Sequence, residues 1–153
     1  MGIFSRYAGS KFLSKQEISA IQQAIGIQEK RTSGEIRLYL ESRCKFMDPV
    51  ERAKELFTEL QMHQTKERNA VLIYIAHQDR QLAIWGDTGI HEILGTDFWN
   101  AQVHHMILEF GKGNFAEGIS KLISEVGDAL HVHFPFDKDS DTNELSDDII
   151  FGK

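Results

Sequence analysis

Two aspartates, Asp87 and Asp97, carry the clearest chemical signal in this sequence. Asp87 follows an apolar strand-like stretch in the turn Trp85–Gly89, and Asp97 begins a helical pattern ten residues later. Carboxylate and carbonyl oxygens around a small cavity are the ligands that Ca²⁺ and Mg²⁺ prefer. The pattern therefore predicts a site for a hard cation or for another polar ligand. Both residues also have common structural uses, because aspartate often caps a helix or occupies a turn.

The elements around these residues follow from hydrophobic periodicity and from capping signals. Ser14 and Glu17 form a capping box for a helix that runs to about Lys30, and Asp48-Pro49 starts a second helix. Strands are predicted at Ile36–Leu40, Asn69–Ala76 and Gln81–Trp85, the last two as a hairpin. A helical turn at Ile90–Leu94, a helix from Asp97 to about Gly111 and a last helix over Phe115–Leu130 complete the pattern.

The order of these elements predicts where the candidate site lies. A strand–helix–strand unit makes the first two strands parallel, and the hairpin makes the third antiparallel. The result is a small mixed sheet with helices on both faces. Its topology brings Gly86 and Asp87 beside Thr32–Glu35 and beside Arg68-Asn69, and the helix from Asp97 leaves the same rim. We therefore expect Asp87, Asp97, Glu35 and Gly86 to hold the cation.

The length of 153 residues and the distribution of charge indicate one domain. We expect an N-terminal extension over residues 1–13, an α/β domain over residues 14–136 and an acidic tail over residues 137–153. The tail carries six acids and two lysines and lacks periodicity, so we expect it to be disordered. Its start resembles a Ca²⁺ loop, but Thr142 stands where that loop needs glycine, and a solvated tail is the better interpretation.

Composition excludes several classes of function. A net charge of −6 and a pI near 5.6 argue against binding to nucleic acid. The single cysteine, Cys44, fits a reducing compartment. No apolar run approaches the ~20 residues needed to span a bilayer, and none forms a signal peptide. We expect a cytoplasmic protein that does not bind a membrane.

Several segments together resemble a TPM domain, a family named after thylakoid-lumen and photosystem repair proteins and their bacterial relatives. The resemblance is carried by Thr32–Ile36, Asn69–Ala76, Gly86–Ile90, Asp97 and Gly113–Ile119. It implies a three-layer α/β/α sandwich, a divalent-cation cleft at the rim described above and the acid phosphatase activity of plastid relatives. Because a signal peptide and a membrane helix are not found, the chain looks like a short cytoplasmic bacterial form.

Three functions remain open from the sequence. The first is a binding module for Ca²⁺ or Mg²⁺ that acts through a protein partner or through cation-dependent stability. The second is a metal-assisted phosphatase, in which Asp87 or Asp97 ligates the metal or acts as a base. No Gly-x-Ser-x-Gly motif and no convergent zinc ligands support a hydrolase, so its catalytic residues are unknown. The third is an interaction domain whose acidic tail recruits a basic partner.

Overall fold

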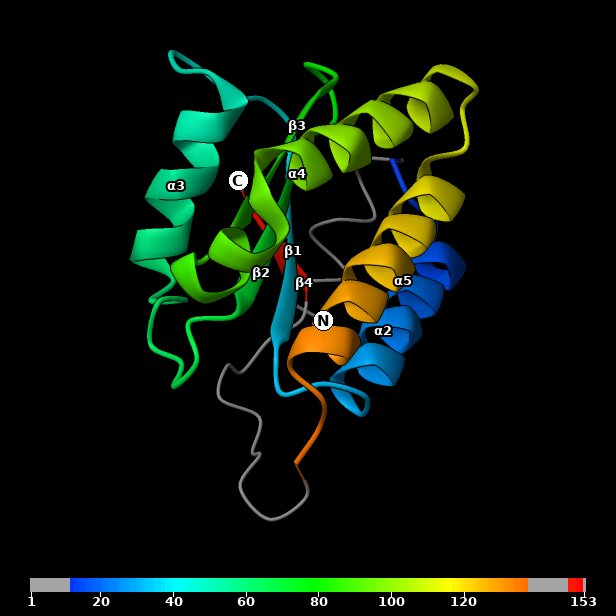
Figure 1. Ribbon diagram of the computed structural model, residues 1–153. Helices are drawn as coiled ribbons and strands as arrows, with labels where there is room; N and C mark the ends of the chain where they lie inside the picture. Colours follow the sequence, from blue (N-terminus) through cyan, green and yellow to red (C-terminus); the bar gives the residue numbers. More distant parts are fainter. Residues whose placement is uncertain (1–11, 138–148, 153) are drawn as a thin grey trace.

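The computed structural model of the chain describes residues 12–137 and 149–152 (Figure 1). Ser14 and Glu17 form the predicted capping box, and Asp48 accepts hydrogen bonds from the first amides of the second helix. The helices are α2 (Lys15–Glu29), α3 (Pro49–Glu59), α4 (Thr88–Gly111) and α5 (Phe115–His133), and the strands are β1 (Glu35–Glu41), β2 (Ala70–Ala76), β3 (Gln81–Gly86) and β4 (Ile149–Phe151).

The elements form the three-layer α/β/α sandwich that was predicted. Figure 1 shows the sheet between α3 on one side and α2 and α5 on the other. Apolar residues of α2, α4 and α5 pack on one face of the sheet around Ile36, Leu38 and Ile73. Residues of α3 pack on the opposite face around Leu72 and Tyr74. Every residue of β2 is buried, as expected for a strand covered on both faces.

The order of strands in the sheet is β3-β2-β1-β4. β1 and β2 are parallel, with Glu35 opposite Ala70, and β3 returns antiparallel to β2, with Gly86 opposite Val71. The start of β2 therefore has the start of β1 on one side and the end of β3 on the other. The sequence predicted that the end of β3 lies beside the starts of both β1 and β2; it lies beside the start of β2, which separates it from β1.

The expectation of a disordered tail needs correction at its end. Ile149–Phe151 forms β4 and pairs in parallel with Leu38–Leu40 of β1. Ile149 and Phe151 are buried in the core on the side of α2 and α5, which accounts for the pairing of so short a strand. Residues 138–148, which include most of the Ca²⁺-loop-like segment, lie outside the described residues, as do residues 1–11.

α4 consists of two helical segments joined across a kink at Gly95, where φ is 78° and ψ is 168°, which confirms the predicted break between the turn at Ile90–Leu94 and the helix near Asp97. The first segment begins at Thr88. Asp87 is the N-cap of the whole element, which places its carboxylate at the helix start. None of the helices in the described ranges is long and apolar enough to cross a membrane.

Candidate functional site

Asp87 lies where β3 ends and α4 begins, at the rim predicted from the sequence. Its backbone N–H donates to the carbonyl of Ala70 at 2.9 Å, which extends the β2–β3 ladder by one residue. Its side chain accepts a hydrogen bond from the N–H of Thr88 at 2.7 Å and is only 4% exposed. The carboxylate is thus fixed in position by the sheet and by the first turn of α4.

Arg68 binds this carboxylate with two parallel hydrogen bonds. Its Nε lies 2.7 Å from Oδ2 of Asp87, and its Nη2 lies 2.8 Å from Oδ1. These bonds raise the pKa of the Arg68 guanidinium above its ordinary value. The Arg68 side chain is 47% exposed, and its backbone has a left-handed φ of 52°. A charged group inside the protein therefore already neutralises Asp87, and a metal ion can reach both oxygens only if Arg68 moves away.

A second polar cluster flanks Arg68 at the same rim. Ser33 donates to Oε2 of Glu67 at 2.8 Å, and Nδ2 of Asn69 donates to Oγ of Ser33 at 3.2 Å. Asn69 is 1% exposed, and its Oδ1 is buried without a hydrogen-bond partner in the part of the chain that the structure describes. Burial removes the water that would hydrate this oxygen, and without a hydrogen-bond donor in its place the folded state loses stability. The chemistry of this oxygen fits a hard cation or an ordered water.

Gly89 holds the loop of these residues close to α4. A Cβ atom on Gly89 would lie 2.0 Å from the carbonyl oxygen of Glu67 and 2.6 Å from that of Arg68. Such distances are far inside van der Waals contact, so only glycine permits this approach. Gly89 thereby fixes the loop that carries Glu67, Arg68 and Asn69 against the N-terminus of α4.

The other predicted ligands come from three different elements of the fold. Glu35 is buried on β1, with β2 between it and β3. Asp97 is exposed in α4, two residues beyond the kink at Gly95. Gly86 adjoins Asp87 and packs against the ring of Trp99. Within residues 12–137 and 149–152, no three histidine, cysteine or acidic side chains gather in a way that could hold a metal. The four-residue set stays a prediction, and any cation here must also use amide, hydroxyl, carbonyl or water oxygens.

A cleft of about 720 Å³ opens beside Asp87, between α3 and α4. Its volume lies within the ~300–1,000 Å³ typical of ligand sites. His91 accepts a hydrogen bond at Nδ1 from Nε1 of Trp99 at 3.1 Å, which orients both rings at this wall. The lining combines apolar side chains with polar ones, two histidines and Arg68 among them: Val50, Phe57, Thr58, His63, Arg68, Ile84, Trp85, Gly86, Asp87, Thr88, His91, Thr96, Trp99 and Asn100.

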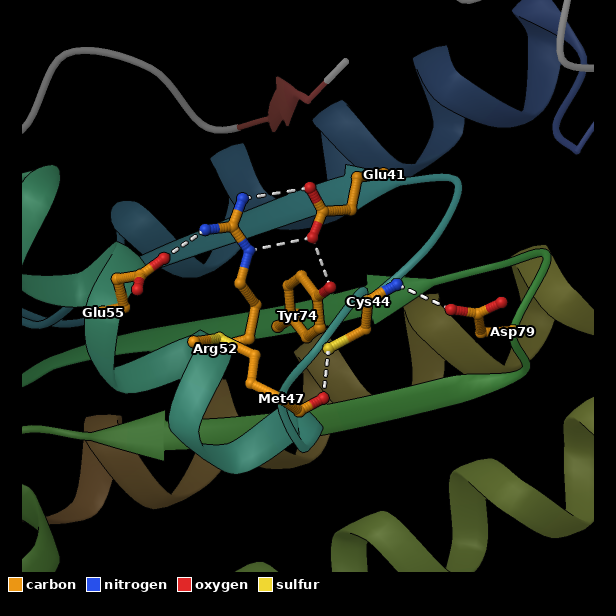
Figure 2. Close-up of polar contacts among 7 residues, drawn as sticks. All are labelled: Glu41, Cys44, Met47, Arg52, Glu55, Tyr74 and Asp79. Carbon is orange, nitrogen blue, oxygen red and sulfur yellow. Dashed lines mark hydrogen bonds and ion pairs between the residues drawn. The ribbon is translucent and has the colours of Figure 1, made fainter.

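A buried charged network at the opposite end of β1 was missed by the sequence analysis. Figure 2 shows Glu41 facing Arg52 of α3, with Nε–Oε2 and Nη2–Oε1 distances of 3.0 and 3.1 Å. The hydroxyl of Tyr74 also donates to Glu41, and burial followed by this bond raises the pKa of Tyr74. Cys44 lies beside them, and its Sγ donates to the carbonyl of Met47 at 3.2 Å. All polar groups of this network face one another, so we assign it to stability.

Comparison with known proteins places the fold in context. The model of the TPM domain matches residues 7–129. The BA42 protein from Bizionia argentinensis has 42% sequence identity and a TM-score of 0.84, over 93% of this chain and 97% of that chain. The N-terminal domain of the cg2496 protein from Corynebacterium glutamicum, at 19% identity, has a TM-score of 0.61 over 77% and 74% of the two chains, a likeness of fold alone. No curated protein matches this chain. The family match covers most of the sequence, and the chain therefore belongs to the TPM domain family.

Proposed function

We propose that this TPM domain is a binding module for a divalent cation, Ca²⁺ or Mg²⁺, at the rim where β1 and β2 begin and β3 ends. The observation that carries the proposal is the buried Oδ1 of Asn69, which has no hydrogen-bond partner among the described residues, while Nδ2 of the same side chain faces the Ser33 hydroxyl and the Glu67 carboxylate. Hard cations bind such oxygens and readily complete their shell with water. A cation that accepted Oδ1 would satisfy a group that otherwise costs stability.

Asp87 is the second anchor that we propose, in competition with Arg68. The guanidinium and a divalent cation need the same two oxygens of Asp87. Because the Arg68 side chain is half exposed, it can swing into solvent without disturbing the core. The net free energy of cation binding at Asp87 is then the free energy of the cation–carboxylate contact less that of the Arg68 ion pair that it displaces. We therefore expect modest cation affinity in the wild type. Asp97 and Glu35 remain candidate ligands on the edge of this site.

A titration with Ca²⁺ and with Mg²⁺, followed by backbone amide NMR shifts, tests the proposal. We expect shifts at Ser33–Glu35, Glu67–Asn69 and Gly86–Gly89. Glu67→Gln and Asp87→Asn should each weaken binding, since each removes a charge that attracts the cation. Arg68→Gln should strengthen it, because the internal competitor is gone.

Two controls keep the outcome clear. Asp79→Asn neutralises a carboxylate in the turn between β2 and β3, at the opposite end of the sheet from the rim, where it pairs with Arg43, and should leave cation affinity unchanged. Asp97→Asn and Glu35→Gln measure whether these predicted ligands take part. Shifts confined to residues 137–148 would place the cation in the acidic tail and refute the site at the rim.

Metal-assisted hydrolysis of phosphate esters is the second candidate function. Arg68 lines the cleft beside Asp87 together with His63 and His91, and a guanidinium at a cleft wall attracts phosphate. A bound metal ion would lower the pKa of its water, and hard cations such as Mg²⁺ do this less than Zn²⁺. We expect at most slow, cation-dependent hydrolysis of p-nitrophenyl phosphate. Activity that persists in chelator and in Asp87→Asn would not belong to this site.

A further inference from the structure

β3 forms one edge of the sheet in the part of the chain that the structure describes. The N–H of Asp87 donates to the carbonyl of Ala70, so the backbone of Asp87 faces β2. This bond shows which residues of β3 face β2 and which face away from it. In an antiparallel pair, alternate residues direct both backbone groups toward the partner strand, and the residues between direct them outward. Trp85 and Ala83 therefore bond to β2, whereas Ile84 and Gly86 present their N–H and C=O groups to the free edge.

The cleft of about 720 Å³ lies along this edge. Ile84, Trp85, Gly86 and Asp87 all line it, so the free edge of β3 forms its floor. α3 packs against β3 on one face of the sheet, and α4 packs against it on the other. Val50 and Phe57 of α3 form one wall together with Trp85, and Trp99 of α4 forms the opposite wall. The groove thus combines unpaired backbone groups at its base with apolar walls on both sides.

Such a combination matches an extended polypeptide. The outward groups of Ile84 and Gly86 recur every second residue, about 6.6 Å apart at ~3.3 Å per residue, which is the repeat of a strand. Apolar walls on both sides suit side chains that alternate between the two faces of an added strand. The opposite edge of the sheet already accepts a short distant segment, since Ile149–Phe151 pairs with β1.

We infer that this groove binds an extended segment of a partner protein, with apolar or β-branched residues in succession, which adds a fifth strand to the sheet beside β3. The inference rests on the edge of β3 and on the walls of the groove, and it does not depend on the proposed cation site. Backbone hydrogen bonds between the bound segment and β3 supply affinity, and the apolar walls formed by α3 and α4 select the side chains of the segment.

The test uses the peptide acetyl-Lys-Val-Thr-Val-Thr-Val-Lys-amide and an analogue that is N-methylated at alternate residues. Both are titrated into the full chain in chelator, followed by amide shifts and hydrogen exchange. We expect the parent peptide to slow exchange at Ile84 and Gly86 by about tenfold or more, because these amides become paired. Ala83 and Trp85 already bond to β2 and should change much less. A ligand that merely fills the cleft would not produce this alternation.

A matched pair of variants tests the walls. Val50→Glu places a charge at an apolar wall, where the native side chain is 45% exposed, and should weaken peptide binding about tenfold. Val132→Glu makes the same change on α5, outside the groove, where the native side chain is 71% exposed, and should have no effect. Glu67→Gln separates the two proposals, because Glu67 does not line the groove: the substitution should reduce cation affinity while the peptide still protects Ile84 and Gly86.

Three results would overturn the inference. One is equal binding of the N-methylated analogue, which would show that backbone pairing is not used. Another is an absence of shifts at Ile84 and Gly86 with about 1 mM peptide, a concentration that reports even weak binding. The third is a change in these amides with protein concentration alone, which would assign the edge to a second copy of the chain.

Discussion

The substitution Arg52→Met tests whether the buried network in Figure 2 holds α3 on the sheet. Methionine retains much of the apolar stem of arginine but removes its charge, so the change isolates the ion pair. Glu41 is 6% exposed and would keep the hydroxyl of Tyr74 as its donor in this network. Removal of one partner from a buried ion pair typically costs ~3–5 kcal/mol.

The structure places this variant at the lower end of that range. The Arg52 side chain is 22% exposed, so water can reach the space that it leaves. We expect a loss of about 3 kcal/mol in the free energy of unfolding. For a chain of 153 residues this corresponds to a decrease in Tm of about 6–12 °C.

Urea unfolding followed by tryptophan fluorescence measures the effect. Trp85 is a suitable probe because Nζ of Lys54, on α3, lies 5.1 Å from the centre of its ring. Arg43→Met is the matched control, since Arg43 is 57% exposed and lies 3.4 Å from Asp79. An exposed pair of this kind contributes less than about 1 kcal/mol.

A double-mutant cycle with Glu41→Gln completes the experiment. We expect a coupling energy between Arg52 and Glu41 of about 1–3 kcal/mol. The reasoning is refuted if Arg52→Met destabilises the protein no more than Arg43→Met, or if the two substitutions in the cycle are additive.

Three further predictions concern other parts of the fold. Gly26→Ala should stabilise the protein by about 0.5–1 kcal/mol, because the added Cβ meets open space within α2. Gly89→Ala should destabilise it, because the added Cβ would overlap the carbonyl oxygen of Glu67. Thermal unfolding of the two variants compares these effects. Burial lowers the pKa of His77 below its ordinary 6.5, so the unfolded state binds the proton more readily and stability should decline as pH falls below about 6.5. His77→Gln should lack that part of the decline when unfolding is measured between about pH 7.5 and 5.5. Phe151→Ala should lower the free energy of unfolding by about 3 kcal/mol, because Phe151 is only 8% exposed in the core. It should also speed amide hydrogen exchange along β1, with which β4 pairs. Unchanged exchange rates in β1 would show that β4 contributes little.

The sequence by itself determined most of the local structure and the position of the rim. The capping box at Ser14 and the Asp48-Pro49 start fix two helix N-termini through side-chain hydrogen bonds to neighbouring amides, which are visible within a few residues. The uninterrupted apolar run of β2 indicates a strand covered on both faces. Once β1 and β2 are parallel and β3 returns, Gly86 and Asp87 must lie beside Asn69, because topology alone brings those ends together.

Only the tertiary structure decided what these residues do. Asp87 is held by Arg68, and Asn69 Oδ1 has no donor among residues 12–137 and 149–152, because the left-handed backbone at Arg68 and the close approach at Gly89 set the directions of neighbouring side chains. Glu41 is buried rather than facing water because Arg52 on another element meets it. The Ile149–Phe151 segment is a strand because the edge of β1 and an apolar pocket exist to receive it. Such outcomes depend on contacts between segments far apart in the chain, which local pattern and propensity do not encode.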